Sequence, residues 1–141
     1  MRNVPIVFSF DNNLILPACI CISSLLENAN AYTFYNIYIL YPGATGIDKD
    51  KIERLSEKYS NFSIKFIPIV NQFDNAFEIR GITTPAYYRL LIPELIPEWD
   101  KILYSDVDVI FRSDLSDIYF NTDLGNCYMA GVRAPSGLNP N

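Results

Sequence analysis

The sequence contains no histidine. This absence excludes Ser/His/Asp and Cys/His nucleophile arrangements and the common histidine zinc sites. Any chemistry that the chain performs therefore depends on carboxylates, hydroxyls, amides and a few basic side chains.

Basic residues are also few, with 11 Lys and Arg against 16 Asp and Glu and a net charge of −5. They do not cluster, so nucleic-acid binding has no electrostatic support. No apolar run reaches the roughly 18 residues of a membrane span, and the N-terminal sequence turns polar too early for a signal peptide. The three cysteines (Cys19, Cys21 and Cys127) lack framework spacing, so we expect reduced thiols and a cytoplasmic location.

What the chain does have is enough apolar sequence for one domain: half of its 141 residues are hydrophobic. Short apolar runs alternate with segments of helical periodicity, which predicts a mostly parallel α/β sheet with helices on both faces. Expected strands cover 4–10, 34–43, 62–70, 101–111 and 127–132, and expected helices cover 16–30, 48–59 and 83–96, the last with a break near Pro93. The final sequence PSGLNPN is typical of a loop, so we expect that the chain is cut from a longer polypeptide.

Polar residues close the first and fourth predicted strands, as DNN (11–13) and SDVD (105–108). Ligands of such sheets lie outside the carboxyl ends of the strands. Since the first and fourth strands of a doubly wound sheet are commonly neighbours, the two polar clusters are expected to face one crevice.

The pair Asp106 and Asp108 follows the apolar sequence KILY. Residues two apart in a strand project from one face, where two carboxylates repel each other unless a cation lies between them. Oxygen-only ligands favour Mg²⁺ or Mn²⁺, which usually share such a site with substrate phosphates. The alternative is that both are solvated turn residues. A second Asp-x-Asp, at Asp48 and Asp50, is typical of a helix start.

Two further predictions have an alternative, and a third concerns helix capping. The segment 11–13 offers the acceptors and amides that read a base or ribose, or else forms an Asx-rich turn. Arg89 either meets a phosphate or extends to solvent. Asp114 and Asp117 are expected to cap a short helical turn over 114–119.

Four blocks together resemble the N-terminal half of family 8 glycosyltransferases, which are retaining enzymes of the GT-A fold. The blocks are PIVFSFDNN, SLLENAN with YNIYIL, ITTPAYYRLLIPELIP and DKILYSDVDVIFRSDLSDIY. They cover residues 4 to about 133, and the last two are the most specific. The family includes bacterial lipopolysaccharide galactosyl- and glucosyltransferases and the glycogenins.

The resemblance implies transfer of a hexose from a UDP-sugar, glucose or galactose, to a saccharide or glycolipid acceptor, in lipopolysaccharide biosynthesis for the bacterial members. It implies Mn²⁺ or Mg²⁺ held by Asp106 and Asp108, contact of Asp11 with uracil and of Asn13 with uridine, and contact of Arg89 with the donor. The full implied donor-binding set is Ser9, Phe10, Asp11, Asn12, Asn13, Arg89, Ser105, Asp106 and Val107.

Two features depart from the family pattern. Leu14 stands where an aromatic residue often stacks on uracil, and the family's third metal ligand is a histidine, which this chain lacks. Acceptor-binding motifs of the family lie downstream of residue 141, and peripheral membrane association is expected only through such a downstream part. No catalytic residue is assigned.

Two competing hypotheses remain beside the transferase. The first is a fragment that binds UDP or a UDP-sugar without catalysis. The second is a phosphatase of the haloacid dehalogenase type, which also places Asp-x-Asp after a strand. That type needs a lysine and a second acidic pair, which do not appear after Asp108.

Overall fold

The computed structural model describes residues 1–70 and 84–132. The elements in chain order are β1 (Arg2–Ser9), the 3₁₀ helix η1 (Asn12–Leu14), α1 (Ile15–Glu27), β2 (Thr33–Pro42), α2 (Lys49–Glu53), η2 (Arg54–Glu57), β3 (Phe62–Ile69), η3 (Thr84–Leu91), α3 (Ile92–Leu95), β4 (Leu103–Tyr104) and α4 (Ser116–Asn121). None of these helices is long and apolar enough to span a bilayer.

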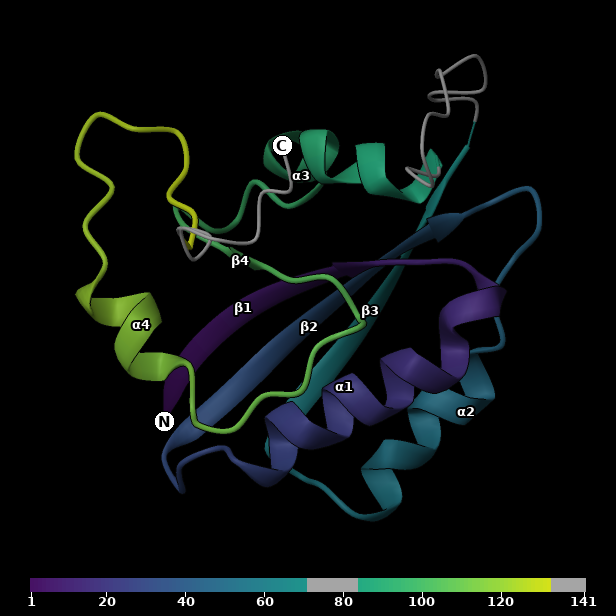
Figure 1. The fold of residues 1–141 in the computed structure, drawn as a ribbon, viewed down its shortest axis with the longest axis horizontal. Coiled ribbons are helices and arrows are strands. Elements are labelled where there is room, and N and C mark those ends of the chain that lie inside the picture. The colour runs from purple at the N-terminus through teal and green to yellow at the C-terminus, as the bar shows by residue number, and fades with distance from the viewer. Residues whose placement is uncertain (71–83, 133–141) are drawn as a thin grey trace, which may run out of the picture.

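The four strands form one sheet in the order β3-β2-β1-β4, and all neighbouring pairs are parallel. β1 lies between two neighbours: Ile6 is opposite Ile37 of β2 on one side and Leu103 of β4 on the other. Figure 1 shows α1 and α2 on one face of the sheet and α3 on the other. The predicted α/β class, the helices on both faces and the adjacent first and fourth strands are confirmed.

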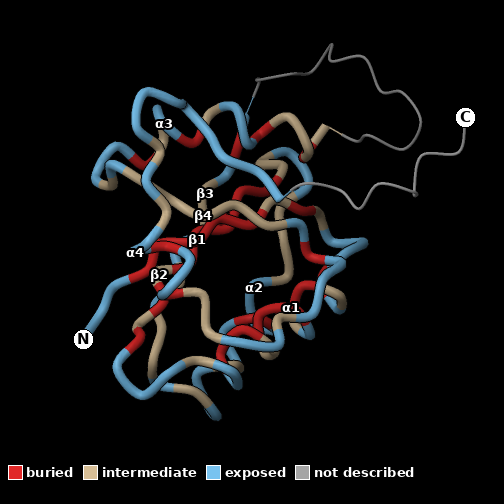
Figure 2. Tube along the Cα trace, turned by 60° about the vertical axis from the view of Figure 1, so that its left-hand side comes forward, coloured by how far each residue is buried: buried red, intermediate tan, exposed pale blue. Residues whose placement is uncertain are grey.

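Side chains of β1 alternate between two hydrophobic clusters. Val4, Ile6 and Phe8 pack on the side of α1, and Val7 packs on the side of α3. All four are fully buried, and in Figure 2 the buried residues gather on the strands and the inner side of α1. Burial of each such side chain stabilises the fold by about 1.5–3 kcal/mol, so β1 is the fixed centre from which the polar residues after Ser9 project.

The fourth strand is much shorter than predicted. Only Leu103–Tyr104 pairs with β1, and the backbone N–H of Ser105 makes one more bond to the Val7 carbonyl at 3.2 Å. The apolar character of the following residues has another cause, since Val107 and Phe111 pack into the cluster on the side of α1. Packing against a helix and pairing in a sheet leave the same apolar pattern in a sequence.

The fifth strand predicted over 127–132 is wrong. In the described part of the chain none of its residues belongs to a strand, and Tyr128, Met129 and Val132 are exposed. Apolar sequence favours a strand only where a sheet edge accepts its backbone hydrogen bonds.

The segment predicted as a helix over 83–96 is mostly 3₁₀ helix in the structure. Residue 83 lies outside the described residues, Thr84–Leu91 is 3₁₀ helix, and the short α3 follows. Pro93 lies in the first turn of α3 and does not break a helix, because its missing N–H needs no partner there. At α2, Asp48 occupies the cap position but makes no capping bond; its carboxylate pairs with Lys51 at 3.0 Å instead.

Candidate functional site

A cavity of about 360 Å³ lies at the carboxyl ends of β1 and β4. It is the kind of place where parallel α/β sheets bind ligands, and its volume lies within the range of small-molecule sites. The cavity is lined by Ser9, Phe10, Asp11, Asn13, Leu14, Pro85, Ala86, Tyr104, Asp106, Val107 and Asp108. The structure therefore brings together the two polar clusters that follow β1 and β4.

The cluster after β1 is an Asx turn that opens η1. The Asp11 carboxylate accepts the backbone N–H of Asn13 at 2.9 Å and its side-chain amide at 3.2 Å. Asn12 does not line the cavity, and its side-chain oxygen accepts the Asp48 backbone N–H at 2.8 Å. The turn fixes Asp11 and Asn13 at the cavity wall, so a structural role and exposure to a ligand coexist here.

Ser9 and Phe10 form the floor between the two clusters. The Ser9 hydroxyl donates to the Pro85 carbonyl at 2.6 Å, which ties η3 to the end of β1. The Phe10 backbone N–H donates to the Leu40 carbonyl at 3.2 Å, and its ring is fully buried. Pro85 and Ala86 therefore form a cavity wall that the sequence did not indicate.

Asp106 and Asp108 lie beyond β4, where the chain bends, and not within a strand as predicted. Val107 between them is buried in the hydrophobic cluster, whereas both aspartates are exposed and line the cavity. The buried valine fixes the backbone, so both neighbouring carboxylates reach the same cavity. Asp106 and Asp108 therefore lie at one cavity as expected, but a bend in the chain brings them there and not the geometry of a strand.

Asp106 has two partners at the cavity wall. The Tyr104 hydroxyl donates to Asp106 Oδ1 at 3.0 Å, and Arg89 Nη2 lies 4.0 Å from the same oxygen. The Arg89 guanidinium lies over the Tyr104 ring, 4.8 Å from its centroid, and its Nε donates to the Ala86 carbonyl at 2.6 Å. Burial and the Asp106 charge raise the pKa of Tyr104 to about 12, although the charge of Arg89 opposes them, so the hydroxyl is protonated at neutral pH.

Tyr104 was missed by sequence reasoning, although a signal existed. It stands two residues before Asp106 at the end of an apolar strand, so it shares that edge of the sheet. Of the other predicted residues, Arg89 and Ser105 do not line the cavity. Arg89 is adjacent to it through Asp106, and the Ser105 hydroxyl donates to the Asp106 carbonyl at 2.9 Å.

Side chains of α1 hold the segment 105–111 in place of strand pairing. The Ser24 hydroxyl accepts the Phe111 N–H at 2.9 Å, and the Asn28 amide donates to the Phe111 carbonyl at 3.1 Å. The Cys21 sulfur lies 3.9 Å from the Asp106 carbonyl oxygen. Burial raises the pKa of Cys21 to about 11. A backbone hydrogen bond from Val109 opposes this shift and the Asp108 charge adds to it, so the thiol is protonated at neutral pH.

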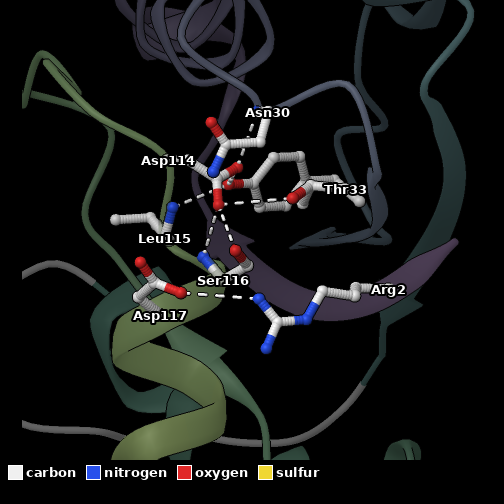
Figure 3. A network of polar contacts seen from close by, with 8 residues as sticks. Arg2, Asn30, Thr33, Asp114, Leu115, Ser116 and Asp117 are labelled. Atoms are coloured by element: carbon white, nitrogen blue, oxygen red, sulfur yellow. Dashed lines mark hydrogen bonds and ion pairs between the residues drawn. The ribbon is translucent and has the colours of Figure 1, made fainter.

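Asp114 anchors the far end of the same segment (Figure 3). Its carboxylate accepts the Asn30 N–H at 3.1 Å, the Thr33 hydroxyl at 3.2 Å and the Tyr35 hydroxyl at 3.0 Å. It also accepts the Ser116 N–H at 2.9 Å and the Ser116 hydroxyl at the start of α4, although the cap position itself is Leu115 and not Asp114 as predicted. Asp117 does not cap; it pairs with Arg2 at 3.4 Å.

The candidate metal ligands are two carboxylates. Asp106 and Asp108 are exposed oxygen donors on one cavity, a set that suits a hard divalent cation that retains waters or phosphate oxygens. In the residues that the structure describes, no group of three or more acidic, cysteine or histidine side chains could hold a metal. Two carboxylates are fewer ligands than a hard divalent cation takes, so an ion here would need further ligands from water or a bound molecule.

Comparison with known proteins places this chain and its fold in a class. Residues 5–138 match the family described as Glycosyl transferase family 8. A putative glycosyltransferase of Haemophilus influenzae is 30% identical over 134 residues, which cover 94% of this chain and 39% of that protein. General stress protein A of Bacillus subtilis is 29% identical over 113 residues, which cover 78% of this chain and 39% of that protein.

Two solved structures share the fold. The galactosyltransferase LgtC, in complex with donor and acceptor sugar analogues, has a TM-score of 0.63 and 27% identity over 86% of this chain and 44% of its own. The bifunctional glycosyltransferase WbbM has a TM-score of 0.71 and 27% identity over 89% of this chain and 22% of its own. The domain thus has a GT-A-like glycosyltransferase fold.

The chain belongs to glycosyl transferase family 8, because the match extends over most of its length. It spans about two-fifths of the length of the curated relatives described above. The resemblance found from the sequence blocks is confirmed, and the phosphatase hypothesis is replaced by this membership.

Proposed function

We propose that this chain binds a UDP-sugar together with Mn²⁺ or Mg²⁺ and forms the donor-binding part of a retaining hexosyltransferase. The observation that carries the proposal is the cavity at the ends of β1 and β4, whose lining includes Asp11 and Asn13 after β1 and Asp106 and Asp108 after β4. Family membership supports glycosyl transfer to a saccharide or glycolipid acceptor. Support for the donor site also comes from LgtC, whose structure was solved with donor and acceptor sugar analogues.

The lining residues after β1 and those after β4 suit different parts of a nucleoside diphosphate. Asp11 and Asn13 supply acceptor and amide groups for the base and ribose, and Leu14 supplies an apolar surface in place of an aromatic ring. Asp106 and Asp108 face the position where a pyrophosphate would place its charge. Carboxylates at this position repel a pyrophosphate unless a cation lies between them.

A bound divalent ion supplies Lewis-acid stabilisation of the charge that develops on the departing UDP. The protein's own contribution is to hold the carboxylates without moving: Val107 is buried beneath them and Ser24 fixes the backbone that follows. Arg89, adjacent to Asp106, adds positive charge beside the same position. Preorganisation of this kind favours the transition state because no reorganisation is needed during reaction.

The binding test is thermal unfolding with UDP and Mn²⁺. A ligand present at 100 times its dissociation constant stabilises a protein by about 2.7 kcal/mol. We expect a stabilisation that requires both UDP and the metal and that disappears in Asp108→Ala. Asp50→Ala, in the second Asp-x-Asp sequence on α2, is the matched control and should retain it. A shift that UDP produces equally without metal, or that survives in Asp108→Ala, would contradict the proposed site.

The second candidate is binding without turnover by these residues alone. The observation that favours it is the length, since the chain spans about two-fifths of its curated relatives. It contains no histidine for the third metal position of the family pattern. We therefore expect no UDP release from UDP-glucose or UDP-galactose by the 141-residue chain, and measurable release would favour the complete transferase activity in this chain.

A further inference from the structure

We propose that Tyr104 is a positioning residue that organises the two halves of the donor site at once. Its hydroxyl orients the Asp106 carboxylate for the cation, and its ring supports the Arg89 guanidinium. The inference rests on the proposed function and deepens it, because it names the side chain that couples the metal position to the anion position.

The hydroxyl contact concerns only one oxygen of the carboxylate. Tyr104 donates to Asp106 Oδ1 at 3.0 Å, and among residues 1–70 and 84–132 no hydrogen bond to Oδ2 is found. The Asp106 side chain is 62% exposed, so without this bond nothing rigid limits its rotation. Tyr104 itself is fixed by the β4 pairing opposite Val7. The Tyr104 hydroxyl therefore holds Oδ1 of Asp106, and Oδ2 remains available to a cation.

The ring contact concerns Arg89. Its guanidinium lies 4.8 Å from the Tyr104 ring centroid, while its Nε is bound to the Ala86 carbonyl at 2.6 Å. These two contacts fix the plane of the group and leave its terminal amino groups to face an oxyanion. Arg89 Nη2 is 4.0 Å from Asp106 Oδ1, which is too long for a strong bond, so Asp106 does not saturate it.

A second tyrosine, carboxylate and cation lie together elsewhere in the chain, away from this cavity. The Tyr38 hydroxyl donates to Glu98 Oε1 at 3.0 Å, Lys65 Nζ lies 3.8 Å from that oxygen, and the same nitrogen lies 5.8 Å from the Tyr38 ring centroid. None of these residues lines the cavity between β1 and β4. A tyrosine, carboxylate and cation together are thus not a site by themselves, and Tyr38→Phe is the matched control for Tyr104→Phe.

The test separates the hydroxyl from the ring. Mn²⁺ affinity is measured by electron paramagnetic resonance with saturating UDP, and UDP affinity by calorimetry with saturating Mn²⁺. Loss of a group that orients a metal ligand typically weakens metal affinity by 10- to 100-fold. For Tyr104→Phe we expect about a 10-fold weaker Mn²⁺ affinity, with UDP affinity at saturating metal unchanged because the ring remains.

Tyr104→Leu removes both contacts. We expect the same loss of Mn²⁺ affinity and, in addition, a roughly 2- to 5-fold weaker UDP affinity at saturating metal, which corresponds to an exposed cation–π contact. That additional loss of UDP affinity should be absent in the Arg89→Met variant, because the effects of substituting two residues in contact are not additive. If the leucine variant does not fold, the phenylalanine variant alone carries the test.

The outcomes separate this inference from the proposed function. If the unsubstituted chain shows no Mn²⁺-dependent UDP binding, the proposed function fails and this inference fails with it. If the unsubstituted chain binds and Tyr104→Phe binds Mn²⁺ equally well, only the inference fails. An equal loss in Tyr38→Phe would show a general effect of stability and would also overturn it.

Discussion

Asp114 and the pair Asp106 and Asp108 lie in the same connection after β4, but their surroundings are opposite. The Asp114 carboxylate is surrounded by donors from Asn30, Thr33, Tyr35 and Ser116. Asp106 and Asp108 are exposed at a cavity, and of the two only Asp106 has a side-chain donor, Tyr104, among the described residues. From the sequence, Asp114 is expected to cap a helical turn and the pair to hold a cation.

The difference teaches how to separate structural from ligand-binding carboxylates. A carboxylate whose acceptor capacity is filled by the protein stabilises the fold and has little left for a ligand. A pair of like charges left with few protein donors costs stability and persists where a ligand compensates. Asp114 belongs to the first kind, and the pair belongs to the second under the proposed function.

The largest expected effect is on Asp114. Asp114→Ala leaves several partly buried donors without an acceptor, so we expect the free energy of unfolding to fall by about 3 kcal/mol. Asp108→Ala should change it by less than about 0.5 kcal/mol, because an exposed side chain is removed. Urea unfolding measures both. Equal losses of unfolding free energy in Asp114→Ala and Asp108→Ala would show that the hydrogen bonds of Asp114 add no stability beyond that of an exposed carboxylate.

For Asp114→Asn we expect a slightly smaller fall in the free energy of unfolding, about 2 kcal/mol at neutral pH. The size of this fall should depend on pH. Burial raises the pKa of Asp114, but hydrogen bonds from Ser116, Asn30 and Tyr35 outweigh it, so its pKa in the folded protein lies below the ordinary value. The unfolded pKa is about 3.9. Asp114 therefore stabilises the fold fully above that pH, and this contribution is lost as the pH falls through the lower folded pKa.

The measurement is urea unfolding at several pH values between neutrality and about pH 3. The unsubstituted chain should lose more stability on acidification than Asp114→Asn does. Ser24→Ala serves as the control, since it destabilises the protein without removing a titrating group and should keep the original slope. An unchanged slope in Asp114→Asn would show that other carboxylates cause the acid sensitivity.

A loss of stability smaller than that of the Asp114 variants is expected from Ser24→Ala, about 1 kcal/mol, because the Phe111 N–H loses its acceptor. The segment that carries Asp106 and Asp108 should then be less well fixed, and Mn²⁺-dependent UDP affinity should fall several-fold without any change in the cavity lining. Ser23→Ala is the neighbouring control. Loss of stability with unchanged affinity would show that α1 does not position the pair.

The sheet was predictable from the sequence because β1 and β2 are largely continuous apolar runs, which are typical of buried parallel strands, and β3 alternates between apolar and polar residues. Because β1 and β4 are neighbours in that sheet, the segments 11–13 and 105–108 were expected to lie close together after them. The end of β4 was not predictable, since Val107 and Phe111 are apolar for contact with α1 and not for strand pairing.

Other features depended on contacts that a single sequence does not show. Pro85 lines the cavity through tertiary packing, and no pattern distinguishes it from an ordinary core residue. Asn12 was predicted as a donor-binding residue, but its side chain bonds to the Asp48 backbone on the next loop. Long-range side-chain hydrogen bonds of this kind leave no periodic signal in the sequence.

The most direct test of the proposed function is the anomalous scattering of manganese in crystals of this chain grown with Mn²⁺ and UDP. The account predicts one strong peak at the cavity between β1 and β4, in contact with Asp106 and Asp108 and with the UDP pyrophosphate. A peak elsewhere, with UDP bound in this cavity and no metal at either aspartate, would contradict it.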